Sequence, residues 1–231
     1  MVEVRYVDGD YLDNNPDWHA ADSPFKARWI FEILQRNGIH PRSFAEIGCG
    51  VGEILVELKK RYPEAKLSGF EVSPQAFSIA STKATSDIDF TLGDFLTSDR
   101  AGFDVAMAID VFEHVPDYMN FIKGVAGKGT YKLFHVPLDL SVSSMMRPHS
   151  ISHVREIIGH LHYFTKDTAL ATIRDCGLEV IDWNYTHGAV ELPNRGLKTR
   201  LANVPRRLMG AVSDDLAVRL FGGASVMILA K

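Results

Sequence analysis

Short apolar runs alternate with helical patterns along most of the chain. The runs predict seven β-strands, because each is short, mostly apolar and bounded by polar or glycine-containing turns. The strands are expected near 43–47, 66–71, 88–92, 103–109, 131–136, 178–183 and 225–230. Apolar residues at helical spacing predict helices near 24–36, 52–61, 74–84, 117–125 and 166–176. This alternation predicts an α/β fold of the doubly wound type, with a parallel sheet and helices on both faces.

Helix starts carry recognisable cap residues. Ser23-Pro24 and Ser73-Pro74 each pair a capping hydroxyl with a first-turn proline. Thr165 is expected to cap the helix that follows it, and Asn37-Gly38 and Gly177 mark helix ends.

Three parts of the chain fall outside the alternation. Residues 138–162 contain four histidines, and residues 185–222 contain two prolines and several basic residues. We predict an N-terminal arm over 1–23 and a single domain over 24–231, with insertions at about 138–162 and 185–222. Loops after the carboxyl ends of parallel strands form ligand sites. Substrate recognition is therefore assigned to the arm and the two insertions.

The first predicted strand runs directly into a glycine turn. The segment Glu46-Ile47-Gly48-Cys49-Gly50-Val51-Gly52 is followed nineteen residues later by Glu71, at the end of the next strand. Glycines let the backbone approach a ligand closely, and a carboxylate at this edge accepts hydrogen bonds from ribose hydroxyls. The dinucleotide fingerprint requires a glycine where Glu53 stands. The turn therefore predicts a ligand with a ribose but without a pyrophosphate.

These residues resemble the motifs of the class I S-adenosylmethionine-dependent methyltransferases. The segment 46–52 is similar to the family's first motif, Glu71 to its ribose-binding acid, and Gly93-Asp94-Phe95 to its adenine-contacting motif. The fourth predicted strand and Asp110-Val111-Phe112-Glu113-His114-Val115 resemble the form found in small-molecule members. The resemblance covers about residues 40–184 and the last strand.

The resemblance implies a Rossmann-like, mostly parallel seven-stranded sheet whose last strand is antiparallel. It implies S-adenosylmethionine as the cofactor, with S-adenosylhomocysteine as its product. The cofactor-binding residues implied in this way are Glu46, Gly48, Cys49, Gly50, Gly52, Glu71, Val72, Asp94, Phe95, Asp110 and Val111.

Methyl transfer to a hydroxyl requires removal of a proton, and histidine suits this task because its pKa lies near neutrality. His114, His160 and His162 are the candidate catalytic residues. His114 has the alternative of opening a helix, and the other two have the alternative of ordinary polar packing. His135 is expected to be a hydrogen-bonded core residue, and His149 and His153 are expected at the surface.

A divalent cation is a further alternative at the fourth strand. Asp110, Glu113 and His114 resemble the E-x-x-E-H sequence that binds a cation in quinone-biosynthesis O-methyltransferases. The shorter Asp110 stands in place of the first glutamate, which reduces its reach. No metal is assigned from the sequence.

Composition limits the possible partners. The formal net charge of −4 argues against non-specific binding to nucleic acid. No apolar run is long enough to predict a membrane span. The two cysteines have no metal-ligand spacing and are expected to be reduced, which suits a cytoplasmic protein. The basic stretch at 195–207 has the alternatives of a solvated face and an anion site, and the apolar stretch at 208–222 leaves a monomer or a homodimer open.

We predict a methyltransferase that acts on a small molecule, by O-methylation of a sugar, a glycan precursor or a secondary metabolite. N-methylation of an amino sugar or another small amine is the alternative, as is a non-catalytic cofactor-binding subunit. An NAD-dependent oxidoreductase is disfavoured by the glycine spacing and Asp94. Methylation of amino groups in nucleic acid or protein is disfavoured because 110–113 lacks the Asn/Asp-Pro-Pro-aromatic motif.

Overall fold

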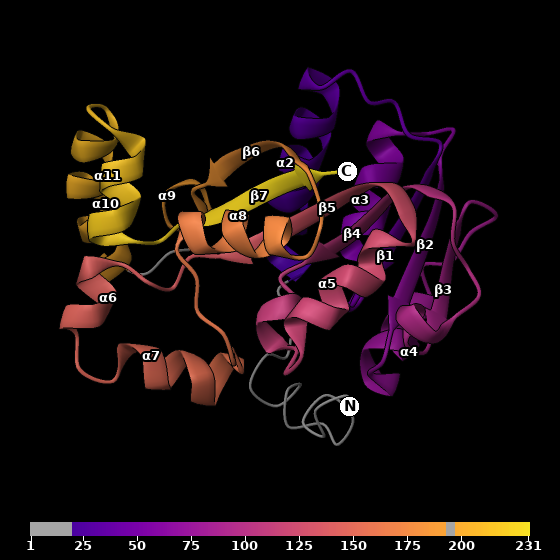
Figure 1. Ribbon diagram of the computed structural model, residues 1–231, viewed down its shortest axis with the longest axis horizontal. Helices are drawn as coiled ribbons and strands as arrows, with labels where there is room; N and C mark the ends of the chain where they lie inside the picture. Colours follow the sequence, from indigo (N-terminus) through magenta and orange to yellow (C-terminus); the bar gives the residue numbers. More distant parts are fainter. Residues whose placement is uncertain (1–19, 193–196) are drawn as a thin grey trace.

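The computed structural model describes residues 20–192 and 197–231 of the chain. Its sheet has seven strands in the order β3-β2-β1-β4-β5-β7-β6 (Figure 1). Their bounds are β1 Ser43–Ile47, β2 Lys66–Glu71, β3 Ile88–Leu92, β4 Phe103–Ile109, β5 Gly129–Pro137, β6 Val180–Thr186 and β7 Ser225–Ala230. The first five strands are parallel, and β7 pairs antiparallel with both β5 and β6. The predicted fold class and the antiparallel last strand are confirmed.

Helices cover both faces of this sheet (Figure 1). The longer ones are α2 Ser23–Arg36, α3 Glu53–Arg61, α4 Pro74–Ser81, α5 Tyr118–Ala126, α8 Lys166–Asp175, α10 Leu197–Gly210 and α11 Asp214–Phe221. One core joins α5 and α8 to one face of the sheet, and a second core joins α2 and α3 to the other. Neighbouring strand residues such as Phe44 and Ala45 enter opposite cores, as the two-residue period of a strand requires.

The predicted boundaries of the helices and strands agree with the structure except at a few element ends. Ser73 and Thr165 cap their helices by accepting hydrogen bonds from the backbone of Ala76 and Thr168. Ser23 is instead the first helical residue, because α2 is preceded by the short 3-10 helix Ala20–Asp22. Strand β6 starts and ends later than predicted, since the chain after α8 reaches the sheet only at Val180.

The insertions contain helices that the sequence pattern did not reveal. They are the short α6 Val142–Met146, α7 Ser150–His153 and α9 Gly188–Glu191, a π-helical turn at Val154–Ile158, and the longer α10 and α11. Most of the predicted arm, residues 1–19, lies outside the described residues.

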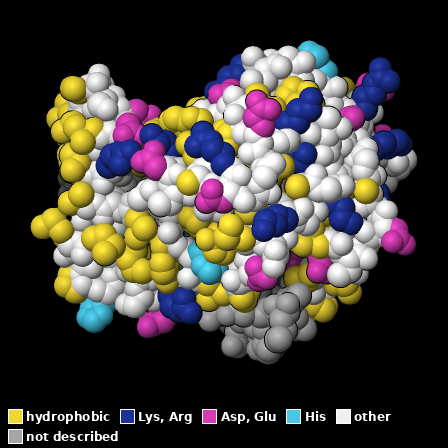
Figure 2. Space-filling model, in the orientation of Figure 1, with side chains coloured by type: hydrophobic (Ala, Val, Ile, Leu, Met, Phe, Trp, Pro, Cys, Tyr) yellow, Lys and Arg dark blue, Asp and Glu magenta, His cyan; other side chains and the backbone are white. Residues whose placement is uncertain are grey.

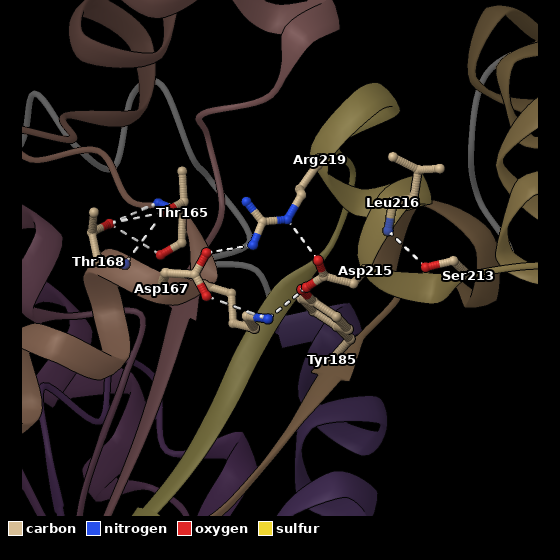
Figure 3. A network of polar contacts seen from close by, with 9 residues as sticks. Thr165, Asp167, Thr168, Tyr185, Ser213, Asp215, Leu216 and Arg219 are labelled. Atoms are coloured by element: carbon tan, nitrogen blue, oxygen red, sulfur yellow. Dashed lines mark hydrogen bonds and ion pairs between the residues drawn. The ribbon is translucent and has the colours of Figure 1, made fainter.

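An ion-pair network attaches α11 to α8 and β6 (Figure 3). The carboxylate of Asp215 accepts hydrogen bonds from Tyr185 at 2.6 Å, Lys166 at 2.5 Å and Arg219 at 2.6 Å. Arg219 also pairs with Asp167 at the start of α8. These partners, Lys166 first, hold the pKa of Asp215 well below its usual range. The second insertion is therefore fixed to the sheet at this point.

Exposed apolar side chains gather over α6, α10 and α11, at the left of Figure 2. Val142, Met145, Met146, Leu208 and Val212 are each about half exposed or more. None of the described helices is long and apolar enough to cross a membrane. Both cysteines are free and buried, as expected.

Candidate active site at the carboxyl edge of the sheet

A cavity of about 1020 Å³ opens at the carboxyl ends of the parallel strands. The strand order reverses between β1 and β4, and this position is where open α/β sheets bind ligands. Ligand pockets commonly measure roughly 300–1,000 Å³, so this one has room for a nucleoside and a second small molecule. Its wall includes Glu46, Gly48, Cys49, Gly50, Glu71, Val72, Asp94, Phe95, Asp110, Val111, His114 and His160.

The glycine turn bends the chain from β1 into α3 at the cavity wall. Gly52 has φ +80° and stands at the N-cap of α3. A Cβ on Gly52 would lie 2.5 Å from the ring of Phe90, and one on Gly48 would lie 2.9 Å from Val111. Gly52 is not part of the cavity wall, so its contribution is to fix the turn that places Gly48 and Gly50 there.

Glu71 is buried at the end of β2 and faces the glycine turn. Its carboxylate accepts hydrogen bonds from the backbone N–H groups of Gly50, Val72 and Ser73, each at 2.8 Å. Burial nevertheless raises the pKa of Glu71 above its ordinary value. The glycine turn and Glu71 are thus joined by hydrogen bonds. Nearby, Nζ of Lys83 lies 2.7 Å from the carboxylate of Glu53.

Glu46 is 1% exposed, and one of its carboxylate oxygens has no hydrogen-bond partner. Burial, together with the nearby charge of Glu71, raises the pKa of Glu46 to about 8, although Lys26 opposes the shift. Burial likewise raises the pKa of the Cys49 thiol. The cavity therefore presents a carboxyl group that a cationic ligand could ionise.

Replacing Glu46 with Gln is expected to change how stability depends on pH. The folded protein keeps the Glu46 proton up to about pH 8, whereas the unfolded chain loses it near pH 4.5. The native state thus binds more protons between these values. The contribution of Glu46 to the free energy of unfolding falls by up to ~1.4 kcal/mol per pH unit as pH rises. Urea unfolding at pH 6 to 8 should show wild type losing stability relative to E46Q; parallel curves would contradict this.

Asp110 follows β4 and forms the centre of a partly buried polar chain. Its carboxylate lies 2.8 Å from Nζ of Lys26 on α2 and 2.5 Å from Nδ1 of His135 on β5. Nε2 of His135 is 2.8 Å from the hydroxyl of Thr186. Burial opposes ionisation of Asp110, but His135 and Lys26 outweigh it and hold its pKa well below the usual range. His135 is therefore the hydrogen-bonded core histidine that the sequence predicted.

His114 and His160 lie side by side at the cavity wall, with ring centroids 4.8 Å apart. Nδ1 of His114 lies 3.1 Å from the carbonyl of Gly159, and Nδ1 of His160 lies 2.7 Å from the carboxylate of Asp139. His162 is placed differently. It lies outside the cavity wall, against the ring of Tyr118, and its Nε2 is 3.0 Å from the carbonyl of Val115.

Asp94 and Phe95 occupy the wall beyond β3. Asp94 is exposed and accepts a hydrogen bond from the N–H of Leu96 at 2.9 Å. Phe95 is 1% exposed and packs its ring against Phe70, with centroids 4.2 Å apart. The Phe95 side chain therefore lies mainly in the core beneath the wall.

Sequence reasoning missed the partners that come from distant segments. Lys26 reaches the site from α2, and Asp139 reaches it from the loop after β5. Glu113, which the sequence offered only as an alternative cation ligand, is fully buried beside the two wall histidines. The only local signal was the polar character of these residues within apolar surroundings.

Comparison with known proteins agrees with this geometry. The family model described as a methyltransferase domain matches residues 21–182. Trans-aconitate 2-methyltransferase of Mycobacterium sp. (strain KMS) is 27% identical over 53% of this chain and 49% of its own. Ajmaline N-methyltransferase of Rauvolfia serpentina is 29% identical over 51% of this chain and 44% of its own. The chain thus spans about half the length of the curated relatives it matches.

Solved structures share the fold at low identity. A putative methyltransferase in complex with the Haloferax volcanii Trm112 activator has a TM-score of 0.67 at 16% identity, covering 100% of this chain and 96% of the other. Magnesium protoporphyrin IX methyltransferase of Synechocystis with bound SAH has a TM-score of 0.60 at 13% identity, covering 90% and 82%. The chain therefore belongs to the methyltransferase-domain family, as a class I member whose cofactor is S-adenosylmethionine.

Proposed function

We propose that the protein transfers the methyl group of S-adenosylmethionine to a hydroxyl of a small molecule. The observation that carries this proposal is that one cavity brings together the glycine turn, Glu71 and the histidine pair His114 and His160. The acceptor oxygen forms a bond to the methyl carbon as the carbon–sulfur bond breaks. The electron pair of that bond returns to sulfur, giving neutral S-adenosylhomocysteine, and the hydroxyl proton passes to an imidazole of the histidine pair.

The cofactor occupies the side of the cavity formed by β1 to β4. Gly48 and Gly50 let the backbone approach it, Glu71 accepts from the ribose hydroxyls, and Asp94 and the backbone at Phe95 contact the adenine. Glu46 would face the sulfonium group, whose positive charge would favour the ionised form of this carboxyl. Cys49, Val72 and Val111 supply apolar wall, while Gly52 fixes the turn and Asp110 fixes Lys26 and His135.

The acceptor occupies the opposite side, which α2, the insertions and α9 build. Phe25, Leu138, Ile158, Ala189 and Leu192 line this part and are apolar. Polar groups converge there at Asp139 and His160. A hydroxylated molecule with an apolar body fits this lining, so among sugars, glycan precursors and secondary metabolites we favour the last. Because both insertions contribute to this lining, we also propose that the protein is a single domain with two insertions on the substrate side.

The enzyme mainly has to hold the nucleophile and the methyl carbon in line, because proximity and orientation alone can lower the reaction barrier by roughly 7–11 kcal/mol.

Incubation with a panel of small hydroxylated and amine acceptors, with products identified by mass spectrometry, tests the proposal. A product that gains one methyl group on oxygen supports it. A product methylated only on nitrogen would favour the N-methyltransferase alternative, and no product with any acceptor would favour a non-catalytic cofactor-binding subunit.

Glu71→Ala is expected to weaken S-adenosylmethionine binding by about 5–150-fold. The substitution removes the acceptor for the ribose hydroxyls, and the loss of one such partner costs about 1–3 kcal/mol of binding. It also leaves the N–H groups of Gly50, Val72 and Ser73 without their partner, which lowers the stability of the free and the bound protein alike. Calorimetric titration measures the affinity. The exposed Glu64 provides the matched control, since Glu64→Ala should bind as wild type does. A folded Glu71→Ala protein with unchanged affinity would remove Glu71 from the cofactor site.

The remaining expectations stay predictions. They are a cytoplasmic location, a monomer or homodimer, and a small-molecule acceptor without a nucleic-acid partner. Arg206, within the basic stretch, donates to the backbone carbonyls of Phe221 and Gly222 and so joins α10 to α11. That use of Arg206 favours a structural role over an anion site.

A further inference from the structure

We propose that Glu113, His114 and His160 bind a divalent transition-metal ion of the zinc type at the acceptor side of the cavity. The role we give the ion rests on the proposed function, but its binding does not. One potential ligand atom from each of the three residues lies within 4.8 Å of the others. Donor atoms about 2.0–2.1 Å from a tetrahedral zinc ion lie roughly 3.3 Å from one another. A small movement of the three side chains would therefore bring their ligand atoms to coordinating positions.

The buried, unpaired carboxylate of Glu113 is independent evidence that a ligand binds here. Its side chain is 0% exposed, and neither carboxylate oxygen has a hydrogen-bond partner. Burying an unpaired polar group costs at least about 1–3 kcal/mol, and buried carboxylates are normally paired or bound to a metal. A cation between Glu113 and the two imidazoles would satisfy this carboxylate.

The outer contacts of the two histidines match those of metal ligands. Metal-binding histidines typically donate their other ring N–H to a carboxylate or a backbone carbonyl. Nδ1 of His114 lies 3.1 Å from the carbonyl of Gly159, and Nδ1 of His160 lies 2.7 Å from Asp139. Carbonyl and carboxylate oxygens only accept, so each Nδ1 carries the hydrogen. In a neutral imidazole of this tautomer the lone pair is on Nε2, which is the atom that can bind a metal.

The backbone holds the three side chains together. Glu113 and His114 are consecutive in the 3-10 helix Phe112–His114, directly after β4. The backbone carbonyl of Glu113 accepts hydrogen bonds from the N–H groups of Leu161 at 2.8 Å and His162 at 3.1 Å. The segment that carries His160 is thereby fixed against the helix that carries the other two ligands. His162 takes part in this backbone pairing, and its Nε2 lies 3.0 Å from the carbonyl of Val115.

The donor set selects the kind of ion. Two imidazoles and one carboxylate suit zinc and similar transition metals, whereas magnesium prefers oxygen donors and octahedral geometry. Asp110 does not join the set, because Lys26 and His135 occupy its carboxylate. His114 and His160 are part of the cavity wall, so a fourth position on the ion faces the cavity. The ligand set therefore differs from the Asp110, Glu113 and His114 group that the sequence suggested.

The open position can take a hydroxyl of the acceptor. A bound divalent cation lowers the pKa of a coordinated oxygen, as it does for water. The hydroxyl proton then passes to solvent, and the oxygen becomes the nucleophile for the sulfonium methyl group. In this account His114 and His160 activate the acceptor as ligands of the ion.

The test is calorimetric titration of chelator-treated, full-length protein with Zn²⁺ alone, and with Mg²⁺ as the comparison ion. We expect one Zn²⁺ per chain and much weaker Mg²⁺ binding. Glu113→Gln and His160→Ala should each weaken Zn²⁺ binding beyond the roughly 10–100-fold typical of an outer-shell partner, and Asp139→Asn should fall within that range. His153→Ala, at an exposed histidine on α7, should bind Zn²⁺ as wild type does.

Co²⁺ absorption provides a second readout, because ligand-field bands report tetrahedral nitrogen and oxygen coordination. The spectrum should appear in wild type and His153→Ala and be lost in Glu113→Gln. Titration with S-adenosylmethionine serves as the folding check on each variant. Normal cofactor binding without Zn²⁺ binding in wild type would overturn the metal site and leave the proposed function intact. Equal Zn²⁺ affinity in wild type and Glu113→Gln would also overturn it.

Discussion

Asp110→Asn is expected to lower the free energy of unfolding by about 2–3 kcal/mol. Removing one partner of a buried ion pair typically costs roughly 3–5 kcal/mol, because the other charge stays buried and unpaired. The side chains of Lys26 and Asp110 are 15% and 26% exposed, so solvent reduces the cost. Asn accepts the positive φ of 55° at this position as readily as Asp, so the substitution tests charge and not backbone strain. Urea unfolding measures the change.

Asp87→Asn is the matched control, because Asp87 also pairs with lysines but at the surface. Lys59 and Lys66 contact it, and its side chain is 34% exposed. Ion pairs that solvent reaches contribute little to stability, so this variant should lose much less stability than Asp110→Asn. Replacing Lys26 with Met together with Asp110→Asn should restore part of the lost stability. Equal losses in Asp87→Asn and Asp110→Asn would show that the Lys26–Asp110 pair stabilises the fold no more than a surface pair does.

His114→Ala is expected to reduce turnover of a hydroxyl acceptor by about 10²–10⁴-fold, which is the usual contribution of acid–base assistance. The imidazole lies at the cavity wall beside His160, where the acceptor proton must be removed. Removal of a metal ligand predicts a loss in the same direction. Affinity for S-adenosylmethionine should stay within a few-fold of wild type, because the proposed cofactor site lies on the other side of the cavity. Steady-state kinetics and calorimetry separate the two effects.

His153→Ala is the control for this prediction, since His153 is exposed on α7. It should retain wild-type turnover. Full activity in His114→Ala would show that His114 neither activates the acceptor nor holds an ion that does so. A parallel loss of cofactor binding would instead place His114 at the cofactor.

The order of elements could be predicted because it depends on local pattern. The central strands β1 and β4 are buried on both faces, so they read as apolar runs, and Ser73 and Thr165 mark helix starts by their own hydrogen bonds. The glycine turn is equally local, since Gly52 has a positive φ that other residues rarely adopt. Glu71 could be predicted because it ends the apolar run 67–70 at a fixed distance after the glycine turn and resembles the family's ribose-binding acid.

The remaining features depend on contacts between distant segments. Lys26 and Asp110 are far apart in sequence, and nothing near Lys26 predicts an acidic partner. The pairing of His160 with Asp139 follows only once the loop after β5 folds back onto the helix after β4. The start of α11 did carry a signal, because Ser213 is followed by two acidic residues and accepts a hydrogen bond from Leu216.

Calorimetric titration of ligand-free protein with S-adenosylmethionine, S-adenosylhomocysteine and NAD tests the central claim most directly. The Glu71 unit and the glycine turn predict binding of both sulfur nucleosides with dissociation constants on the order of micromolar, about −8 kcal/mol. NAD should not bind, because Glu53 stands at the start of α3 where a pyrophosphate would lie. A folded protein that binds neither sulfur nucleoside, or that binds NAD instead, would contradict the account.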